Sequence, residues 1–105
     1  MNNLLQPQHC AHMLRVLGDP ERLRIIECLR SGPKNVSEIA DLLDTVIVKI
    51  SHHLGVLKHA DVVLDEKQGR FVVYRLNPAV YSPAEPSADK DHLDLGCCRL
   101  EIPKA

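Results

Sequence analysis

Apolar residues recur at helical spacing through the first half of the chain, in four segments separated by helix breakers. Helices are predicted over residues 7–17, 20–30, 36–43 and 46–59, from the inward stripes Met13/Leu14/Leu17, Leu23/Ile26/Leu29, Val36/Ile39/Ala40/Leu43 and Ile50/Leu54/Leu57. Gly18-Asp19-Pro20 and Ser31-Gly32-Pro33 separate the first three. Asn35, three residues before Glu38, has the spacing of a capping box. The pattern predicts a four-helix N-terminal half.

The pattern changes to that of strands after the fourth helix. Val62–Leu64 and Phe71–Tyr74 are β-branched or aromatic runs on either side of Lys67-Gln68-Gly69-Arg70, which is typical of a hairpin. A helix followed directly by a hairpin is the order found in winged helices, which bind DNA through a helix in the major groove. We therefore predict an α+β, mainly α fold: a winged helix-turn-helix with a β-hairpin wing.

A third pattern begins beyond Leu76. Prolines at 78, 83 and 86 rule out a long helix there. Further on, alternation returns in two parities: Leu93, Leu95 and Cys97, then Cys98, Leu100 and Ile102. We predict a winged-helix domain over residues 1–78 and an irregular C-terminal extension over residues 79–105, either with a short strand or packed as an ordered extension on the domain.

Composition limits the size of the core and the choice of partners. A chain of 105 residues with no Trp, one Phe and two Tyr has a small aliphatic core, so dimerisation would supplement its stability. The net charge is −1, but residues 45–75 carry five cations and three anions, whereas residues 76–105 carry three cations and five anions. A locally basic segment beside an acidic tail favours a DNA-binding module.

The sequence contains no apolar run long enough for a bilayer and no leader-like segment. We expect a cytoplasmic protein without membrane contact, in which four cysteines act as thiols, metal ligands or redox sensors rather than as a disulfide framework. A thiol enzyme is disfavoured because the chain lacks a Cys-x-x-Cys motif and a glycine-rich cofactor loop. No obligatory cofactor is expected.

Residues 10–78 resemble the ArsR/SmtB family of dimeric winged-helix repressors. Four motifs carry the resemblance, in the order Leu17-Gly18-Asp19-Pro20-Glu21-Arg22-Leu23-Arg24-Ile25, Val36-Ser37-Glu38-Ile39-Ala40, Ser51-His52-His53-Leu54 and Gly69–Leu76. The resemblance implies a homodimer on a near-palindromic operator. The outward polar positions of the fourth helix and wing are then the candidate DNA contacts: Lys49, Ser51, His52, His53, Lys58, Lys67 and Arg70.

The chain departs from the family pattern at several positions. Val46-Ile47-Val48 stands where small polar residues are common, His52 where Arg is common, and Gly55 where Lys often follows. The Cys-x-Cys site of some members is missing from residues 35–43. Asp91 and His92 also lack the long C-terminal helix that carries a metal site in others.

The adjacent Cys97 and Cys98 offer a different site. Their thiolates suit trivalent arsenic, antimony or a soft metal ion. Alternatively they form a vicinal disulfide, which would be strained because neighbouring Cα atoms lie about 3.8 Å apart and a relaxed bridge prefers about 4.4–6.8 Å. By the resemblance, Cys10 is the third ligand, from the same or the other subunit. All three could instead be structural, and Cys28 is read as a small buried hydrophobe.

The leading hypothesis is a DNA-binding transcriptional repressor, released from its operator when the thiol site binds an arsenite-like oxyanion or a soft metal ion. One alternative is a repressor of the same fold that senses peroxide through a disulfide. Another is a winged-helix protein-interaction module without DNA binding, favoured by the near-neutral charge and by apolar Val46–Val48.

Overall fold

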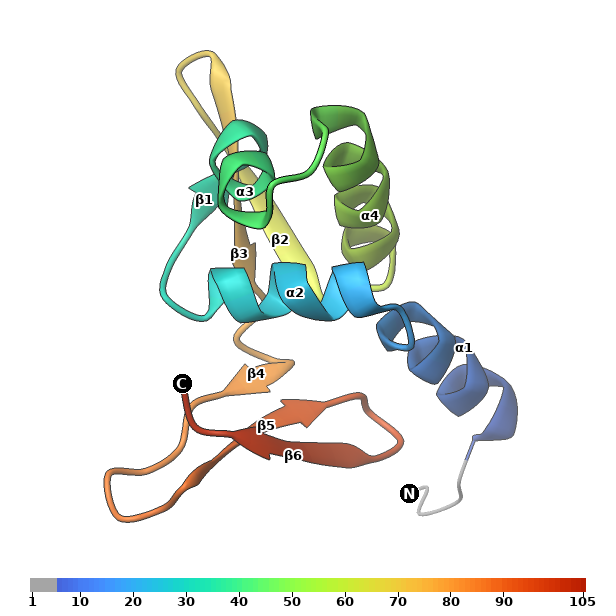
Figure 1. The fold of residues 1–105 in the computed structure, drawn as a ribbon. Coiled ribbons are helices and arrows are strands. Elements are labelled where there is room, and N and C mark those ends of the chain that lie inside the picture. Colours follow the sequence, from blue (N-terminus) through green and yellow to red (C-terminus); the bar gives the residue numbers. More distant parts are fainter. Residues whose placement is uncertain (1–5) are drawn as a thin grey trace.

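The structure is a computed structural model that describes residues 6–105. Its elements are α1 (Pro7–Leu17), α2 (Pro20–Leu29), β1 (Lys34–Asn35), α3 (Val36–Leu43), α4 (Ile47–His59), β2 (Val63–Gln68), β3 (Phe71–Leu76), β4 (Tyr81–Ser82), β5 (Lys90–Asp94) and β6 (Arg99–Pro103). Figure 1 shows two layers: α2, α3, α4 and the β2–β3 hairpin form one, and the β4–β6 sheet lies beneath α2. The predicted winged helix-turn-helix is confirmed.

The helix starts agree with the sequence signals. At α2 the Asp19 carboxylate accepts hydrogen bonds from the amides of Glu21 and Arg22, 2.9 and 3.2 Å away, and Pro20 occupies the first turn. At α3 the predicted capping box is present, with both Asn35–Glu38 hydrogen bonds formed. In contrast, α4 begins at Ile47, and its N-cap residue Val46 provides no side-chain cap.

Aliphatic side chains from all four helices meet in one core. Ile50, Leu54 and Leu57 are fully buried, as the stripe on α4 predicted. The stripes predicted for α1 and α2 are wrong at one position each, because Leu14 and Leu23 remain 48% and 47% exposed. In a helix of ten or eleven residues, the apolar positions fit more than one inward face. In the structure, aliphatic residues near Leu14 and Leu23 are buried instead.

The wing is a three-stranded antiparallel sheet in the order β1-β3-β2. The hairpin pairs Val63 with Leu76 at its base and Gln68 with Phe71 at its tip. Gly69 adopts a φ of 62°, the left-handed value favoured at the first position of a two-residue hairpin turn. The two-residue strand β1 adds an edge to β3 and was not predicted.

The C-terminal extension is a second antiparallel sheet in the order β4-β5-β6, so it is regular rather than irregular, while the expected ordered packing on the domain is confirmed. Leu93 pairs with Leu100 across the β5–β6 hairpin, and Gly96 turns the chain with a φ of 88°. The two opposite parities in the sequence are therefore two strands of one hairpin. Leu93 and Leu95 pack into the same core as the helices.

A buried carboxylate fastens this sheet to α2. Asp91 on β5 is 1% exposed and lies 3.2 Å from the guanidinium of Arg30, whose side chain is 6% exposed. Tyr81 donates its hydroxyl to Asp91 at 2.6 Å, and the Ala84 amide donates at 2.7 Å. Arg30 also donates to the Pro103 carbonyl at the end of β6. The network holds all three strands and the end of α2 together.

The same contacts predict how stability depends on pH. The hydrogen bond from Tyr81, with the backbone amides and Arg30, holds the pKa of Asp91 below its usual range, although burial opposes this. The stabilisation from a carboxyl with a lowered pKa is present above the unfolded pKa of about 4 and is lost as the pH falls through the folded value. Burial and the Asp91 hydrogen bond raise the pKa of Tyr81.

We predict that Asp91→Asn lowers the urea midpoint at pH 7, because Arg30 loses its buried counter-charge. The variant should also lose less stability than the wild type between pH 7 and about pH 3, since its side chain cannot titrate. Urea titrations at both pH values, with the cysteines in one redox state, measure this. Asp89→Asn on the exposed connection is the matched control. Equal pH dependence in wild type and Asp91→Asn would contradict the assignment.

Candidate functional site

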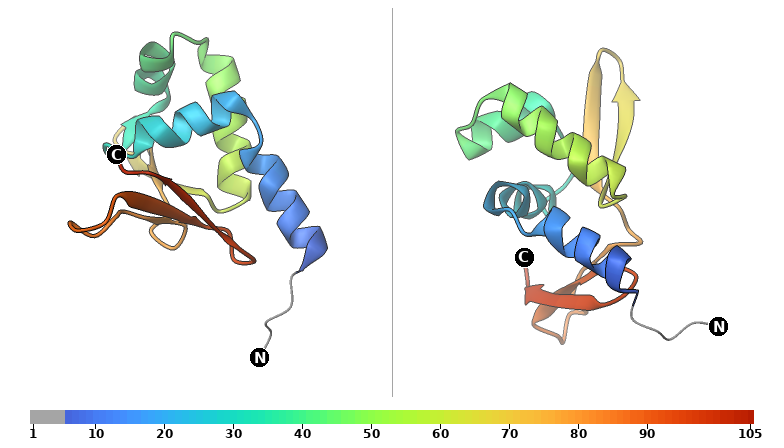
Figure 2. Two further views of the ribbon diagram at one scale, coloured as in Figure 1. Left: turned by 60° about the horizontal axis from the view of Figure 1, so that its bottom comes forward. Right: turned by 90° about the vertical axis from the view of Figure 1, so that its right-hand side faces the viewer.

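The N-terminal end of α4 and the tip of the β2–β3 hairpin lie at the same end of the molecule. Figure 1 and the right-hand view of Figure 2 both show this end opposite the β4–β6 sheet. The predicted DNA-contact residues that are exposed are Lys49, Ser51, His52, Lys58, Lys67 and Arg70. A helix and a hairpin that project together form the surface that a winged helix presents to DNA.

His53 does not share this surface, and its predicted outward position is wrong. Its side chain is only 12% exposed. His53 Nε2 lies 3.1 Å from a carboxylate oxygen of Glu21, and its Nδ1 accepts a hydrogen bond from Arg22 Nε at 3.2 Å. The Glu21 carboxylate also attracts Lys49, whose Nζ is 3.7 Å away. Position 53 follows buried Ile50 by three residues, which places it at the margin of the inward stripe.

Arg22 joins three helices. Besides His53 on α4, its guanidinium donates to the Val16 carbonyl at the end of α1, at 3.0 Å from Nη1. In the sequence, Arg22 stands out only as part of the Leu17–Ile25 motif. It connects α1 to the helix that carries Ser51 and His52.

Two cations have intramolecular partners near the wing. Lys58 at the end of α4 donates to Asp65 on β2 at 2.8 Å, and this hydrogen bond raises the pKa of Lys58. The Arg70 guanidinium lies over the Phe71 ring, 5.9 Å from its centroid, a distance at which a cation–π interaction operates. Arg70 remains exposed at the wing tip and Lys58 is half-exposed.

The second group of predicted residues meets at the β5–β6 turn. The Sγ atoms of Cys10, Cys97 and Cys98 lie within 4.8 Å of one another. Cys10 comes from α1 of the same chain and is buried, whereas Cys97 and Cys98 are half-buried. Among residues 6–105, these three cysteines are the one group of this size with ligand atoms close enough to share a metal ion.

The disulfide differs from the sequence-based expectation. Cys10 and Cys97 are bonded, with their Cα atoms 5.9 Å apart, whereas the sequence predicted free thiols or a Cys97–Cys98 bridge. The separation of 5.9 Å falls within the relaxed range for a disulfide, and adjacent residues cannot reach it. Cys98 keeps a free thiol, 3.9 Å from the sulfur of Cys97.

His9 contributes to the same corner. Its Nε2 lies 3.2 Å from the Leu95 carbonyl oxygen, and a Cβ atom at Gly96 would approach that nitrogen to 3.4 Å. In the sequence, His9 is the residue immediately before Cys10. It adds a polar contact between α1 and the turn that carries Cys97.

Comparisons with known proteins agree with this architecture. A family model for a helix-turn-helix domain matches residues 17–66. The transcriptional repressor SdpR of Bacillus subtilis is 35% identical over 69 residues, which cover 66% of this chain and 77% of SdpR. The chain belongs to the ArsR/SmtB family of DNA-binding transcriptional repressors.

Solved structures of other regulators support the same assignment. The crystal structure of a possible transcriptional regulator for arsenical resistance has 39% identity and a TM-score of 0.61, covering 64% of this chain and 70% of that chain. The homodimeric winged helix-turn-helix domain of Mb0332 from Mycobacterium bovis, a possible ArsR-family regulator, has 26% identity and a TM-score of 0.63, covering 67% and 65%.

The expectation of a regulator rather than an enzyme is confirmed by these relatives. No helix within residues 6–105 is both long enough and apolar enough to cross a membrane.

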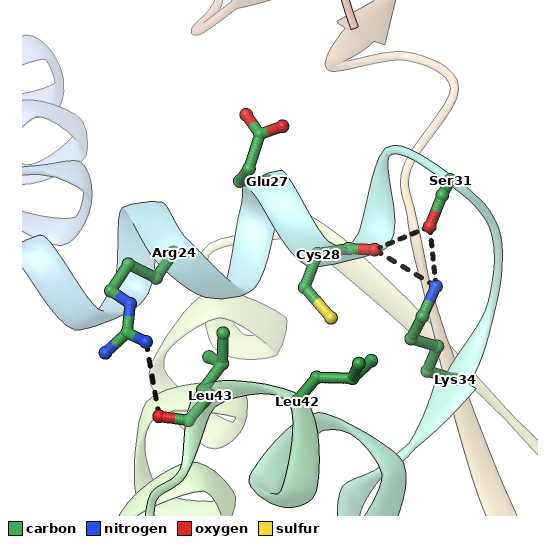
Figure 3. Close-up of a pocket in the computed structure, with 7 residues that line it drawn as sticks. All are labelled: Arg24, Glu27, Cys28, Ser31, Lys34, Leu42 and Leu43. Atoms are coloured by element: carbon green, nitrogen blue, oxygen red, sulfur yellow. Dashed lines mark hydrogen bonds between the residues drawn. The ribbon is translucent and has the colours of Figure 1, made fainter.

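Cys28 of this ArsR/SmtB member lies away from the other three cysteines. Cys28 lines a pocket of about 400 Å³ between α2 and α3, and Figure 3 shows its thiol directed towards Leu42 and Leu43. The Lys34 ammonium group donates to the Cys28 carbonyl at 3.1 Å. Burial raises the pKa of the Cys28 thiol, against the attraction of Lys34 for its charged form. These features fit a structural role, although Cys28 is half-buried rather than fully buried as predicted.

We predict that Cys28 reacts slowly with iodoacetamide at pH 7, because little thiolate is present when the pKa is raised. The rate should increase when the protein is unfolded in urea, which removes the burial. Peptide mapping by mass spectrometry after timed alkylation measures this, with Cys98 in the same sample as an internal comparison. Equal rates for Cys28 in the folded and unfolded protein would contradict the buried setting.

Proposed function

We propose that this chain is a homodimeric repressor that binds a near-palindromic operator and releases it when a three-thiol site binds an arsenite-like oxyanion or a soft metal ion. The supporting observation is the approach of the Cys10, Cys97 and Cys98 sulfurs to within 4.8 Å of one another. They come from segments 87 residues apart in sequence, so the fold has to bring them together.

For DNA binding we propose that α4 enters the major groove and that the wing contacts the backbone. Ser51 and His52 are the candidates for base edges, while Lys49, Lys67 and Arg70 are candidates for phosphates. Lys58 is a weaker candidate because it is already paired with Asp65 at 2.8 Å. His53 is reassigned from DNA contact to the positioning of α4, through Glu21 and Arg22.

For assembly we propose that α1 contributes to the dimer contact. Leu14 on α1 and Leu23 on α2 are large apolar side chains that stay about half exposed in one chain. A second copy would cover them. The Mb0332 domain, a relative in fold, is homodimeric.

The thiol chemistry suits arsenite without any change of oxidation state. Three thiols displace three hydroxide groups from As(OH)₃, forming three As–S bonds and releasing three water molecules. Sulfur is the donor that soft ions prefer. The site requires the reduced protein, because the Cys10–Cys97 disulfide uses two of the three sulfurs.

The effect on DNA would pass through α1. Cys10 lies on α1, the Val16 carbonyl at its far end accepts from Arg22, and Arg22 contacts His53 on α4. A shift of α1 on effector binding would change the contacts that orient α4. A preference of about 1–3 kcal/mol for the DNA-incompetent form is sufficient, since it changes DNA affinity by roughly 5- to 150-fold.

The Cys10–Cys97 disulfide supports peroxide sensing as a second candidate. One thiolate attacks the peroxide, giving a sulfenic acid and an alcohol or water. The second thiol then displaces water from the sulfenic acid and closes the disulfide. The bond holds α1 against the β5–β6 turn. Effector binding would draw α1 towards the turn in the same way.

We predict that Arg70→Ala weakens binding to all duplexes and reduces the slope of log affinity against log salt by about one unit, as loss of a phosphate contact does. Fluorescence anisotropy over a KCl series measures the slope. Arg99→Ala, an exposed arginine on β6, should leave the slope unchanged. An unaltered slope in Arg70→Ala would remove the wing from the interface.

We predict that Cys97→Ser/Cys98→Ser binds the operator normally but is released neither by arsenite nor by peroxide. The single variant Cys98→Ser separates the two mechanisms. It should lose most of its arsenite response, because a three-sulfur site becomes a two-sulfur site, and should keep its peroxide response, because Cys10 and Cys97 remain. Operator release is followed by anisotropy on protein reduced beforehand with a phosphine, because dithiols themselves bind arsenite, and the phosphine is removed before peroxide is added.

Cys28→Ser is the matched control and should respond to both agents as the wild type does. Normal release of the double variant would exclude the three cysteines as the sensor and leave the repressor assignment intact. Failure of the wild type to bind any operator would overturn the repressor function itself.

A further inference from the structure

Three consecutive β-branched residues at the start of α4 are exposed to solvent. Val46, Ile47 and Val48, which we term the apolar turn, are 63%, 51% and 79% exposed. Val46 holds the N-cap position without a side-chain cap, although Ser, Thr, Asp and Asn are favoured there. The core takes its α4 contribution from Ile50, Leu54 and Leu57, so folding of the single chain does not use the apolar turn.

The apolar turn lies within the surface proposed to meet DNA. It forms the end of α4 that projects on the same side as the wing tip (Figure 1). Val48 precedes Ser51 and His52 by three and four residues, so helical geometry places the three on one face. Residues 46–59 contain Lys49 and Lys58 and no acidic residue. Lys67 and Arg70 add exposed positive charge on the wing.

DNA offers a specific apolar partner at this position. The C5-methyl of thymine is the apolar group on the base edges of the major groove. Branched side chains present methyl groups close to the backbone and lose little rotamer freedom on contact. Each thymine methyl buried against them would strengthen binding.

We propose that Val46, Ile47 and Val48 determine operator specificity by contacting thymine methyl groups, so that the operator carries thymine at the base pairs facing the first turn of α4. The inference rests on the proposed repressor function and adds which base it recognises. The alternative occupant is another protein. The cations around the apolar turn disfavour a protein partner. The apolar turn also lacks the aromatic residues that typify protein-interface cores.

The test uses the full chain and duplexes selected from a random-sequence pool. In the tightest duplex, each thymine is replaced in turn by deoxyuridine, which keeps every hydrogen-bonding group and removes only the methyl. At the thymines facing the apolar turn, affinity should fall about fourfold per methyl, the factor given by roughly 0.8 kcal/mol per buried methylene-sized group. Thymines elsewhere in the duplex should show no change.

Val48→Ser should abolish this deoxyuridine penalty at one position per half-site while still binding the duplex. Leu42→Ser is the matched control, since Leu42 is an exposed leucine on α3 and its change should leave the penalty intact. Sequence-selective binding without any deoxyuridine penalty would overturn the inference and leave the repressor function standing. If the deoxyuridine penalty is absent and the protein self-associates in a way that Val48→Ser abolishes, the apolar turn is assigned to a protein contact. Failure to select any duplex would overturn both proposals.

Discussion

The buried pair of Asp91 and Arg30 determines where the C-terminal sheet can lie. A carboxylate that is 1% exposed is tolerated only with a counter-charge and enough hydrogen-bond donors, and Arg30, Tyr81 and the Ala84 amide supply them. These partners lie at the C-terminal end of α2, on β4 and in the β4–β5 connection. The sheet therefore docks on α2 in one position, and that position brings the β5–β6 turn to α1. The three-cysteine cluster depends on it.

Local signals in the sequence predicted most of the helical half of the fold. The capping box of Asn35 and Glu38 and the stripe of Ile50, Leu54 and Leu57 involve residues within one or two helical turns, so spacing alone reveals them. The Gly69-Arg70 turn between two β-branched runs revealed the wing for the same reason.

The features that were missed depend on contacts between distant segments. Strands β4 and β6 are short edges that form only against β5, and the disulfide joins residues 87 positions apart. The parity change between Leu95 and Leu100 was a local sign of a hairpin. The hairpin was not predicted because two adjacent cysteines lie at the turn and were interpreted only as a chemical site. His53 was misplaced because its partners, Glu21 and Arg22, belong to another helix.

The two faces of α4 have different constraints. This explains how, under the proposed function, one small domain could both bind DNA and respond to agents that react with its cysteines. The inner face is fixed by Ile50 and Leu54 in the core and by His53 through Glu21 and Arg22. The outer face, with Val48, Ser51 and His52, is exposed along its length.

Arg22 reaches from the inner side of α4 to the last turn of α1, and Cys10 lies in the first turns of that same helix. Under the proposed function, chemistry that draws Cys10 towards the β5–β6 turn would therefore move α1 and alter the contacts of Arg22 with α4. Arsenite binding and disulfide formation would pull α1 in the same direction, yet they exclude each other because they share Cys10 and Cys97. Such a site would report either agent through one movement, with Cys98 alone determining which agent it favours.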